Sequence, residues 1–264
     1  MRRRLGLTLL AVVVTSACFR STTTITVKQD GSGVIDQEIG ASAGAMALLR
    51  NFSSGDQADK KTSADVQLFG PEQAQAAASA MGVRFVSGEP VKTAEVEGYR
   101  AHFAFDDVTK VKFSVNKTPP GPGAGVAPKV EDPPFAFGFA KNNGNSVLTI
   151  NIPEPKPGET GMLPKMPGSS GSSQDNALAM SMLMPMLRGL YVDVSLVVDG
   201  KIIKTNAPYV AGSQVTLVQF DFDKVSAADG ALQKLQQITD PRQLKDIPGV
   251  RMPTEPVLTI EFGR

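Results

Sequence analysis

The stretch from Tyr191 to Asp223 constrains the fold most, because it holds several strand patterns close together. In 192–198 every second residue is Val or Leu, which is typical of a half-buried strand. Asp199-Gly200 follows, a pair suited to a tight hairpin turn, and 201–205 continues in extended form. In 216–222 every second residue is Thr, Val or Phe. The stretch therefore predicts a β-meander around which the remaining chain packs.

Two further hairpins are expected. One joins 24–28 to 34–39 through the turn Asp30-Gly-Ser-Gly33, and the other joins 135–139 to 148–152 through Asn142–Asn145. The Asp30 turn has an alternative reading as a calcium loop, but the other carboxylates of an EF-hand are absent, so turn chemistry is favoured. The remaining strand patterns are at 83–86, 91–96, 99–105, 111–115 and 256–262.

Helices are expected at 71–81, where Pro71 suits the first turn and Gly82 the end, and at 231–238. Shorter patterns favour helices at 41–51 and 175–190. Helices mixed with hairpins predict an α+β fold, with a curved antiparallel β-sheet and a few helices packed on one face.

The first eighteen residues resemble an export signal. Arg2–Arg4 form a positive region, Leu5–Val14 is apolar but too short to span a membrane, and small residues 15–17 precede Cys18. Cys18 is the only cysteine, and its position resembles that of the lipidated cysteine in bacterial lipoproteins. The alternative is ordinary cleavage with Cys18 unmodified. We predict a signal peptide at 1–17 and a lipidated tether at 18–24.

Residues 25–264 are predicted to form a single domain. Two stretches rich in Pro and Gly, near 119–134 and 153–173, are predicted to be mobile loops within it.

The composition argues against several classes of function. Lys and Arg number 27 against 26 Asp and Glu, so no basic surface points to nucleic acid. The chain has one His, no Trp and no Gly-x-Ser-x-Gly motif, so no hydrolytic site stands out. His102 is expected on the face of 99–105 opposite the aromatic residues. We predict a protein that is not an enzyme and that needs neither a cofactor nor a metal.

The helix at 175–190 carries an unusual set of methionines, Met180, Met182, Met184 and Met186. Thioethers bind Cu(I), but no His or Cys lies nearby, so packing or pocket lining is favoured over copper. Together with Phe135, Phe137 and Phe139, these methionines are the candidate lining of an apolar ligand pocket.

The DGSG turn after the signal, Asp199-Gly200, Thr205-Asn206 and the 212–216 run GSQVT together resemble LppM-type bacterial lipoproteins. Two positions depart from the pattern of that family, which often has Pro-Gly at the turn and Trp where Leu217-Val218 stands. The resemblance implies an α+β domain with an apolar pocket for a lipid, and it brings no catalytic residues.

Two functions follow as hypotheses for a protein of the bacterial cell envelope, on the periplasmic side of the outer membrane in a Gram-negative cell. The first is a non-catalytic module that binds a lipid or another amphipathic ligand. The alternative is a structural lipoprotein that docks to an envelope protein and holds no small ligand; a sealed core would favour it. In both, the membrane is a partner through Cys18.

Overall fold

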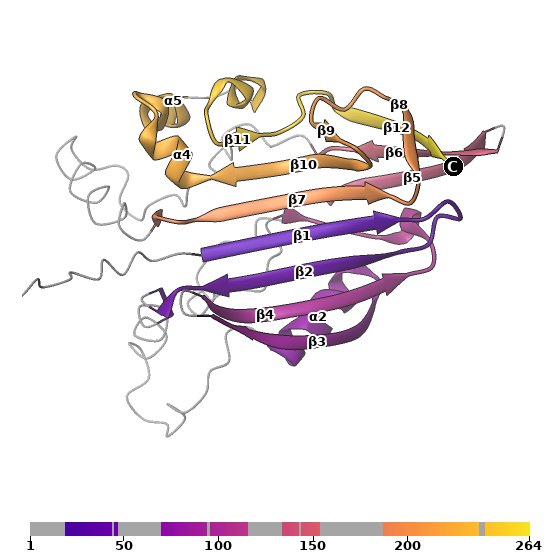
Figure 1. Ribbon diagram of the computed structural model, residues 1–264, viewed down its shortest axis with the longest axis horizontal. Coiled ribbons are helices and arrows are strands. Elements are labelled where there is room, and N and C mark those ends of the chain that lie inside the picture. Colours follow the sequence, from indigo (N-terminus) through magenta and orange to yellow (C-terminus); the bar gives the residue numbers. More distant parts are fainter. Residues whose placement is uncertain are drawn as a thin grey trace, which may run out of the picture.

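The computed structural model describes residues 19–43, 45–46, 70–93, 96–115, 134–142, 144–153, 187–237 and 241–264. These residues form two β-sheets with short helices around them (Figure 1). The large sheet has the order β11-β10-β7-β1-β2-β4-β3, with β9 also paired to β10, and the small sheet has the order β5-β6-β12-β8.

The strands of the large sheet are β1 (Phe19–Val27), β2 (Gly33–Ala41), β3 (Arg84–Lys92), β4 (Glu97–Phe105), β7 (Tyr191–Val198), β9 (Val210–Ala211), β10 (Gln214–Asp221) and β11 (Val250–Arg251). Those of the small sheet are β5 (Ala136–Asn142), β6 (Asn145–Asn151), β8 (Lys201–Thr205) and β12 (Val257–Gly263). The helices are α2 (Pro71–Met81), α4 (Phe222–Ala227), α5 (Ala231–Gln237) and the 3-10 segments η1 (Val108–Lys110) and η4 (Pro241–Asp246).

The large sheet has one buried face and one open face. Along β1, β2 and β4, buried residues alternate with half-exposed ones, as the period of a strand requires. We call the buried side the inner face and the other side the outer face. Ile25, Ile35 and Phe103 point to the inner face and are fully buried.

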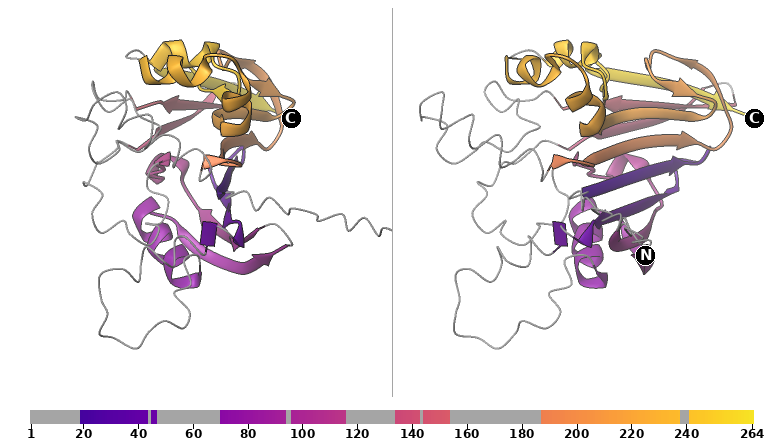
Figure 2. Two further views of the ribbon diagram at one scale, coloured as in Figure 1. Left: turned by 90° about the vertical axis from the view of Figure 1, so that its left-hand side faces the viewer. Right: turned by 60° about the vertical axis from the view of Figure 1, so that its left-hand side comes forward.

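The small sheet and α2 both cover the inner face of the large sheet (Figure 2). One continuous core therefore joins Ala74 and Ala78 of α2, Phe103 of the large sheet, and Ile150 and Phe262 of the small sheet. A second, smaller core lies where α4, α5 and η4 meet β10 and β11, around Phe222 and Val225.

The predicted meander is correct in its strands and wrong in its pairing. β7 pairs with β10, but β8 leaves for the small sheet and pairs with β12 instead of β7. The chain turns from one sheet to the other at Gly200, which has a φ of 142°. A Cβ at this position would lie 2.4 Å from the backbone oxygen of Gly263, so the turn requires glycine. The place beside β7 is taken by β1, which runs parallel to it. The prediction of one antiparallel sheet is thus replaced by two sheets with one parallel pair.

The predicted tether at 18–24 is also wrong for residues 19–24, because β1 begins at Phe19. Its residues pair with β2 from Phe19↔Ala41 onward and with β7 from Arg20↔Tyr191 onward. The polar run Ser21–Thr24 resembles a linker in composition, yet Ser21 and Thr23 are buried on the inner face. Cys18 itself and the predicted signal at 1–17 lie outside the described residues.

Several local predictions are confirmed. α2 begins at Pro71 and ends at Met81, and Gly82, whose φ is 71°, caps it. The hairpins β1–β2 and β5–β6 are present, as are α5 and β12. The two strands expected at 83–86 and 91–96 are one strand, β3. No strand forms at 111–115, where Phe113 makes a single bridge to Phe135. The structure is mainly β with few helices, which agrees with an α+β class in a loose sense.

The turn at Asp30 has the chemistry expected of it. Its Oδ1 accepts hydrogen bonds from the backbone N (3.0 Å) and Oγ (2.7 Å) of Ser32. These bonds lower the pKa of Asp30 below its ordinary value. Asp107 caps η1 in the same way through Thr109, and its pKa is lowered for the same reason.

Candidate functional site

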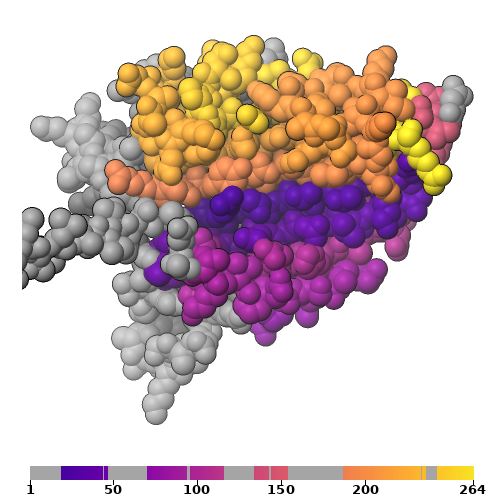
Figure 3. All heavy atoms as spheres, in the orientation of Figure 1, coloured from indigo at the N-terminus to yellow at the C-terminus, as the bar shows by residue number. Residues whose placement is uncertain are grey.

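The outer face of the large sheet is the principal candidate surface. On β1, β2 and β4 the residues that point outward are mostly Thr or charged, with Thr22, Thr24 and Thr26 in one row along β1. Figure 3 shows atoms of these strands open to view across the face, and Figure 1, in the same orientation, draws no helix of the described chain in front of them. The core lies on the other side, so the side chains here contribute little apolar packing.

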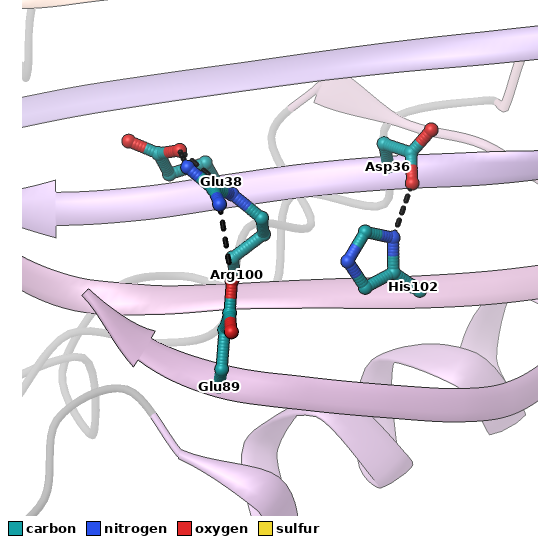
Figure 4. A network of polar contacts seen from close by, with 5 residues as sticks. All are labelled: Asp36, Glu38, Glu89, Arg100 and His102. Atoms are coloured by element: carbon teal, nitrogen blue, oxygen red, sulfur yellow. Dashed lines mark hydrogen bonds and ion pairs between the residues drawn. The ribbon is translucent and has the colours of Figure 1, made fainter.

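A polar cluster occupies the part of this face made by β2, β4 and β3 (Figure 4). Arg100 donates from Nε and Nη2 to Oε2 of Glu38, at 3.1 Å and 2.8 Å, and from Nη1 to Oε1 of Glu89 at 3.0 Å. Nδ1 of His102 contacts Oδ1 of Asp36. Cross-strand pairing positions all of them, because Arg100 lies opposite both Glu38 and Glu89, and His102 lies opposite Asp36. We call these residues the outer-face cluster: Asp36, Glu38, Glu89, Arg100 and His102.

The electrostatics of the cluster are those of a solvated surface. The hydrogen bond and the charge of Glu38 raise the pKa of Arg100 above its ordinary value, so the guanidinium stays charged. The side chains of Arg100 and Glu89 are 43% and 62% exposed, and exposed ion pairs of this kind contribute little to stability. Three carboxylates, those of Asp36, Glu38 and Glu89, surround the single guanidinium of Arg100 and the imidazole of His102, which leaves the cluster acidic.

Ser87, next to the cluster on β3, adds the residue type that a hydrolytic site would need. Ser87 of β3 lies opposite His102, and His102 lies opposite Asp36, so nucleophile, base and acid stand side by side. The side chains of His102 and Asp36 are 42% and 44% exposed. Triad chemistry depends on donors aimed at an oxyanion and on exclusion of water. The open setting therefore favours a polar surface pair over a catalytic centre.

A shallow depression lies between α2 and the inner face, lined by Gln37, Ile39, Gly70, Gln73, Ala74, Tyr99 and Ala101. Its space is about 20 Å³, enough for about one water molecule. Small-molecule sites offer roughly 300–1,000 Å³. The depression as described holds no room for a lipid chain.

Of the aromatic residues predicted to line a pocket, Phe135 and Phe137 belong to the buried core, and Phe139 packs against it. Phe135 and Phe137 are buried, with exposed fractions of 3% and 6%, and Phe135 packs on Phe113 with ring centroids 6.1 Å apart. Phe139 is half-buried against Gly31, whose Cβ would lie 3.1 Å from its ring. Met180, Met182, Met184 and Met186 lie outside the described residues, so the predicted lining stays a prediction.

Two other predictions concern ligands and membranes. Within the described chain, no group of three or more His, Cys, Asp or Glu side chains is placed to hold a metal ion. Asp221 and Asp223 accept local hydrogen bonds: Asp221 caps α4 by accepting from the backbone N of Lys224 at 3.2 Å, and Asp223 accepts from the backbone N of Gly189 at 3.0 Å. None of the helices in the described ranges is both long and apolar enough to cross a membrane.

Apart from the position of His102 opposite the aromatic face, the outer-face cluster is not predicted by the sequence patterns above. A signal was present, since Asp36 and Glu38 alternate on one side of β2 while Arg100 and His102 alternate on one side of β4. Opposite charges at matching positions of two paired strands would have predicted these contacts. The missing information was that β2 pairs with β4, which local sequence patterns do not specify.

Comparison with known proteins gives one partial likeness. No family model matches the chain, and no curated protein matches its sequence. Among solved structures, the folded domain of the Mycobacterium tuberculosis LppM protein, determined by NMR, matches with a TM-score of 0.33 and 10% identity. That match covers 99% of this chain and 95% of the other. A TM-score this low does not establish a shared fold, so the resemblance to LppM-type lipoproteins stays a prediction.

Proposed function

We propose that this protein is an exported, lipid-anchored protein of the bacterial envelope that binds another envelope protein through the outer face of its large sheet. It acts by binding and not by catalysis. The anchor is Cys18, and the signal that precedes it consists of Arg2–Arg4, the apolar run Leu5–Val14 and the small residues 15–17.

The buried core is the observation that favours docking to a protein over carrying a lipid. The inner faces of the two sheets meet in side chains that are almost wholly buried, Phe103 and Leu196 from one, Leu258 and Phe262 from the other. Among the described residues these side chains pack against one another, and the depression beside α2 offers space for only about one water molecule. This supports a docking module over the alternative, a carrier of a lipid or another amphipathic molecule.

The outer face supplies the features that a docking surface needs. The backbone of this face is held in place, because β1 is paired with a neighbouring strand on both sides. Its ordered charges, from Asp36 to Arg100, can form charge-assisted hydrogen bonds with a protein partner. They contribute little to stability, so they are available for recognition.

Native mass spectrometry tests the choice between docking and lipid carriage. The chain from Phe19 to Arg264 contains every described residue, and we expect its mass to show no bound lipid after gentle purification from a bacterial host. A stoichiometric mass excess that extraction identifies as phospholipid or glycolipid would overturn the docking function.

Site-specific photo-crosslinking in cells then tests the face. A photoreactive residue at Thr22, on the outer face of the large sheet, should crosslink to one envelope protein in the full-length chain. The matched control is Thr259, an exposed Thr on the open side of β12 in the small sheet. Equal crosslinking from both positions, or none from Thr22, would contradict the assignment of the face.

A further inference from the structure

The start of β1 determines how the molecule can stand on a membrane. Phe19 is the first residue of β1, and it is already paired with Ala41 of β2. Arg20 is paired on both sides, with Gly40 and with Tyr191. Cys18 is adjacent to Phe19 in the sequence, so their Cα atoms are about 3.8 Å apart.

This short connection limits the distance between the start of the sheet and an anchor on Cys18. A tether covering 18–24 would have allowed a reach of roughly 20 Å or more, at about 3.3–3.6 Å for each residue. With the strand starting at Phe19, a lipid on Cys18 holds the end of the large sheet within about one residue spacing of the lipid headgroups. The far end of β1 then lies about 30 Å away, at about 3.3 Å for each residue of the strand.

The side chains at this end suit a headgroup layer. The guanidinium of Arg20 lies 5.0 Å from the ring centroid of Tyr191, on the neighbouring strand β7. Arg188 is exposed just before β7. Arginine binds lipid phosphates, and tyrosine concentrates at the membrane interface, where its ring is partly apolar and its hydroxyl is hydrated.

We propose that the molecule stands on the membrane with the end of the large sheet that contains Phe19, Arg20 and Tyr191 in direct contact with the headgroups. The occupant of this end is a lipid surface. The inference rests on lipidation of Cys18 in the proposed function. The strands then rise from the membrane, and the outer face is presented sideways to proteins in the same envelope compartment.

Energy transfer to labelled lipids tests this orientation. The chain has one Cys and no Trp, so Cys18 can be coupled to a maleimide lipid, and a single introduced Trp is the only donor of its kind. The protein used for the measurement comprises residues 18–264. It is coupled to vesicles of phosphatidylcholine and phosphatidylglycerol that also contain lipids with a dansyl-labelled headgroup, which are the energy acceptors. The near reporter is Tyr191→Trp, which keeps an aromatic ring under Arg20. The far reporter is Lys28→Trp, an exposed site just past the other end of β1.

We expect several-fold higher transfer from the near reporter than from the far one. A Gly/Ser linker inserted between Cys18 and Phe19 should bring the two values together. Equal transfer from both reporters without the linker would overturn the orientation. Arg20→Glu should reduce the difference in transfer between the two reporters on these anionic vesicles, while Lys204→Glu in β8 should leave that difference unchanged. The reverse result would show that Arg20 does not contact the headgroups.

Chemical coupling separates this inference from the proposed function. If Cys18 is not lipidated in cells, the full-length chain and its Cys18→Ala variant will distribute equally between membrane and soluble fractions. That outcome would contradict the anchor and leave the coupled experiment interpretable. A failed orientation with a lipidated Cys18 would contradict only the inference drawn here.

Discussion

Gly40 and Gly98 face each other on the outer side of β2 and β4. A Cβ at Gly98 would lie 2.1 Å from the backbone oxygen of Ile39 and 2.5 Å from Cα of Gly40. Both contacts are to backbone atoms, so the strands would have to move apart. At this residue scale, the close approach of β2 and β4, which also aligns Arg100 with Glu38, depends on the absence of a side chain.

We therefore predict that Gly98→Ala lowers the free energy of unfolding by about 1–3 kcal/mol, the usual cost of overpacking. Urea denaturation followed by circular dichroism would measure it. Gly138→Ala in β5 is the matched control, because a Cβ there would lie 3.5 Å from Cβ of Thr149, an ordinary contact. Equal effects of the two substitutions would show that strand propensity, and not the close approach, determines the result.

At the scale of elements, strands could be predicted from local pattern while their partners could not. The alternation in β7 and β8 locates both strands, but β8 pairs with β12, more than fifty residues further along the chain. The same holds for the outer-face cluster, since the pairing of β2 with β4 joins Asp36 to His102, 66 residues apart. Local periodicity predicts on which face of a strand a residue lies. The register between strands that are distant in the sequence depends instead on how the whole core packs.

The amino-acid composition of β1 does not indicate that it is a central strand. Its sequence FRSTTTITV is rich in Thr, and its first half reads as a polar tether. Its position between β2 and β7 makes it a central strand, where Thr is favoured by its branched side chain. The strand is thus needed for both the fold and the geometry of the anchor.

We predict that a chain beginning at Thr23 is much less stable than one beginning at Phe19. The truncation removes Phe19–Thr22, whose backbone is paired with β2 and, from Arg20, with β7. At about 0.5–1.5 kcal/mol for each lost backbone hydrogen bond, the total is several kcal/mol. Thermal melting by circular dichroism would measure the loss. A chain beginning at Phe19 is the control. If both chains melt at the same temperature, residues 19–22 act as a tether and not as part of a strand.

At the scale of the whole molecule, the two sheets share one core. Phe103 of β4 and Phe262 of β12 are both fully buried and belong to the same cluster. The hairpin between β1 and β2 adds polar contacts across the sheets, because Ser146 of β6 donates from Oγ to the backbone oxygen of Gln29 at 2.8 Å. A core that crosses from one sheet to the other leaves neither sheet with a complete interior of its own.

The molecule should therefore unfold as one unit. We predict that Phe103→Ala and Phe262→Ala each lower the free energy of unfolding by about 3–5 kcal/mol and that each variant keeps a single transition. Val257→Ala, at a 40% exposed position of β12, is the control and should change stability by less than about 0.5 kcal/mol. Amide hydrogen exchange distinguishes the alternatives, since a shared core requires the most protected amides of both sheets to open with the same free energy. Selective loss of protection in the small sheet of Phe262→Ala, with the large sheet unchanged, would show two independent units.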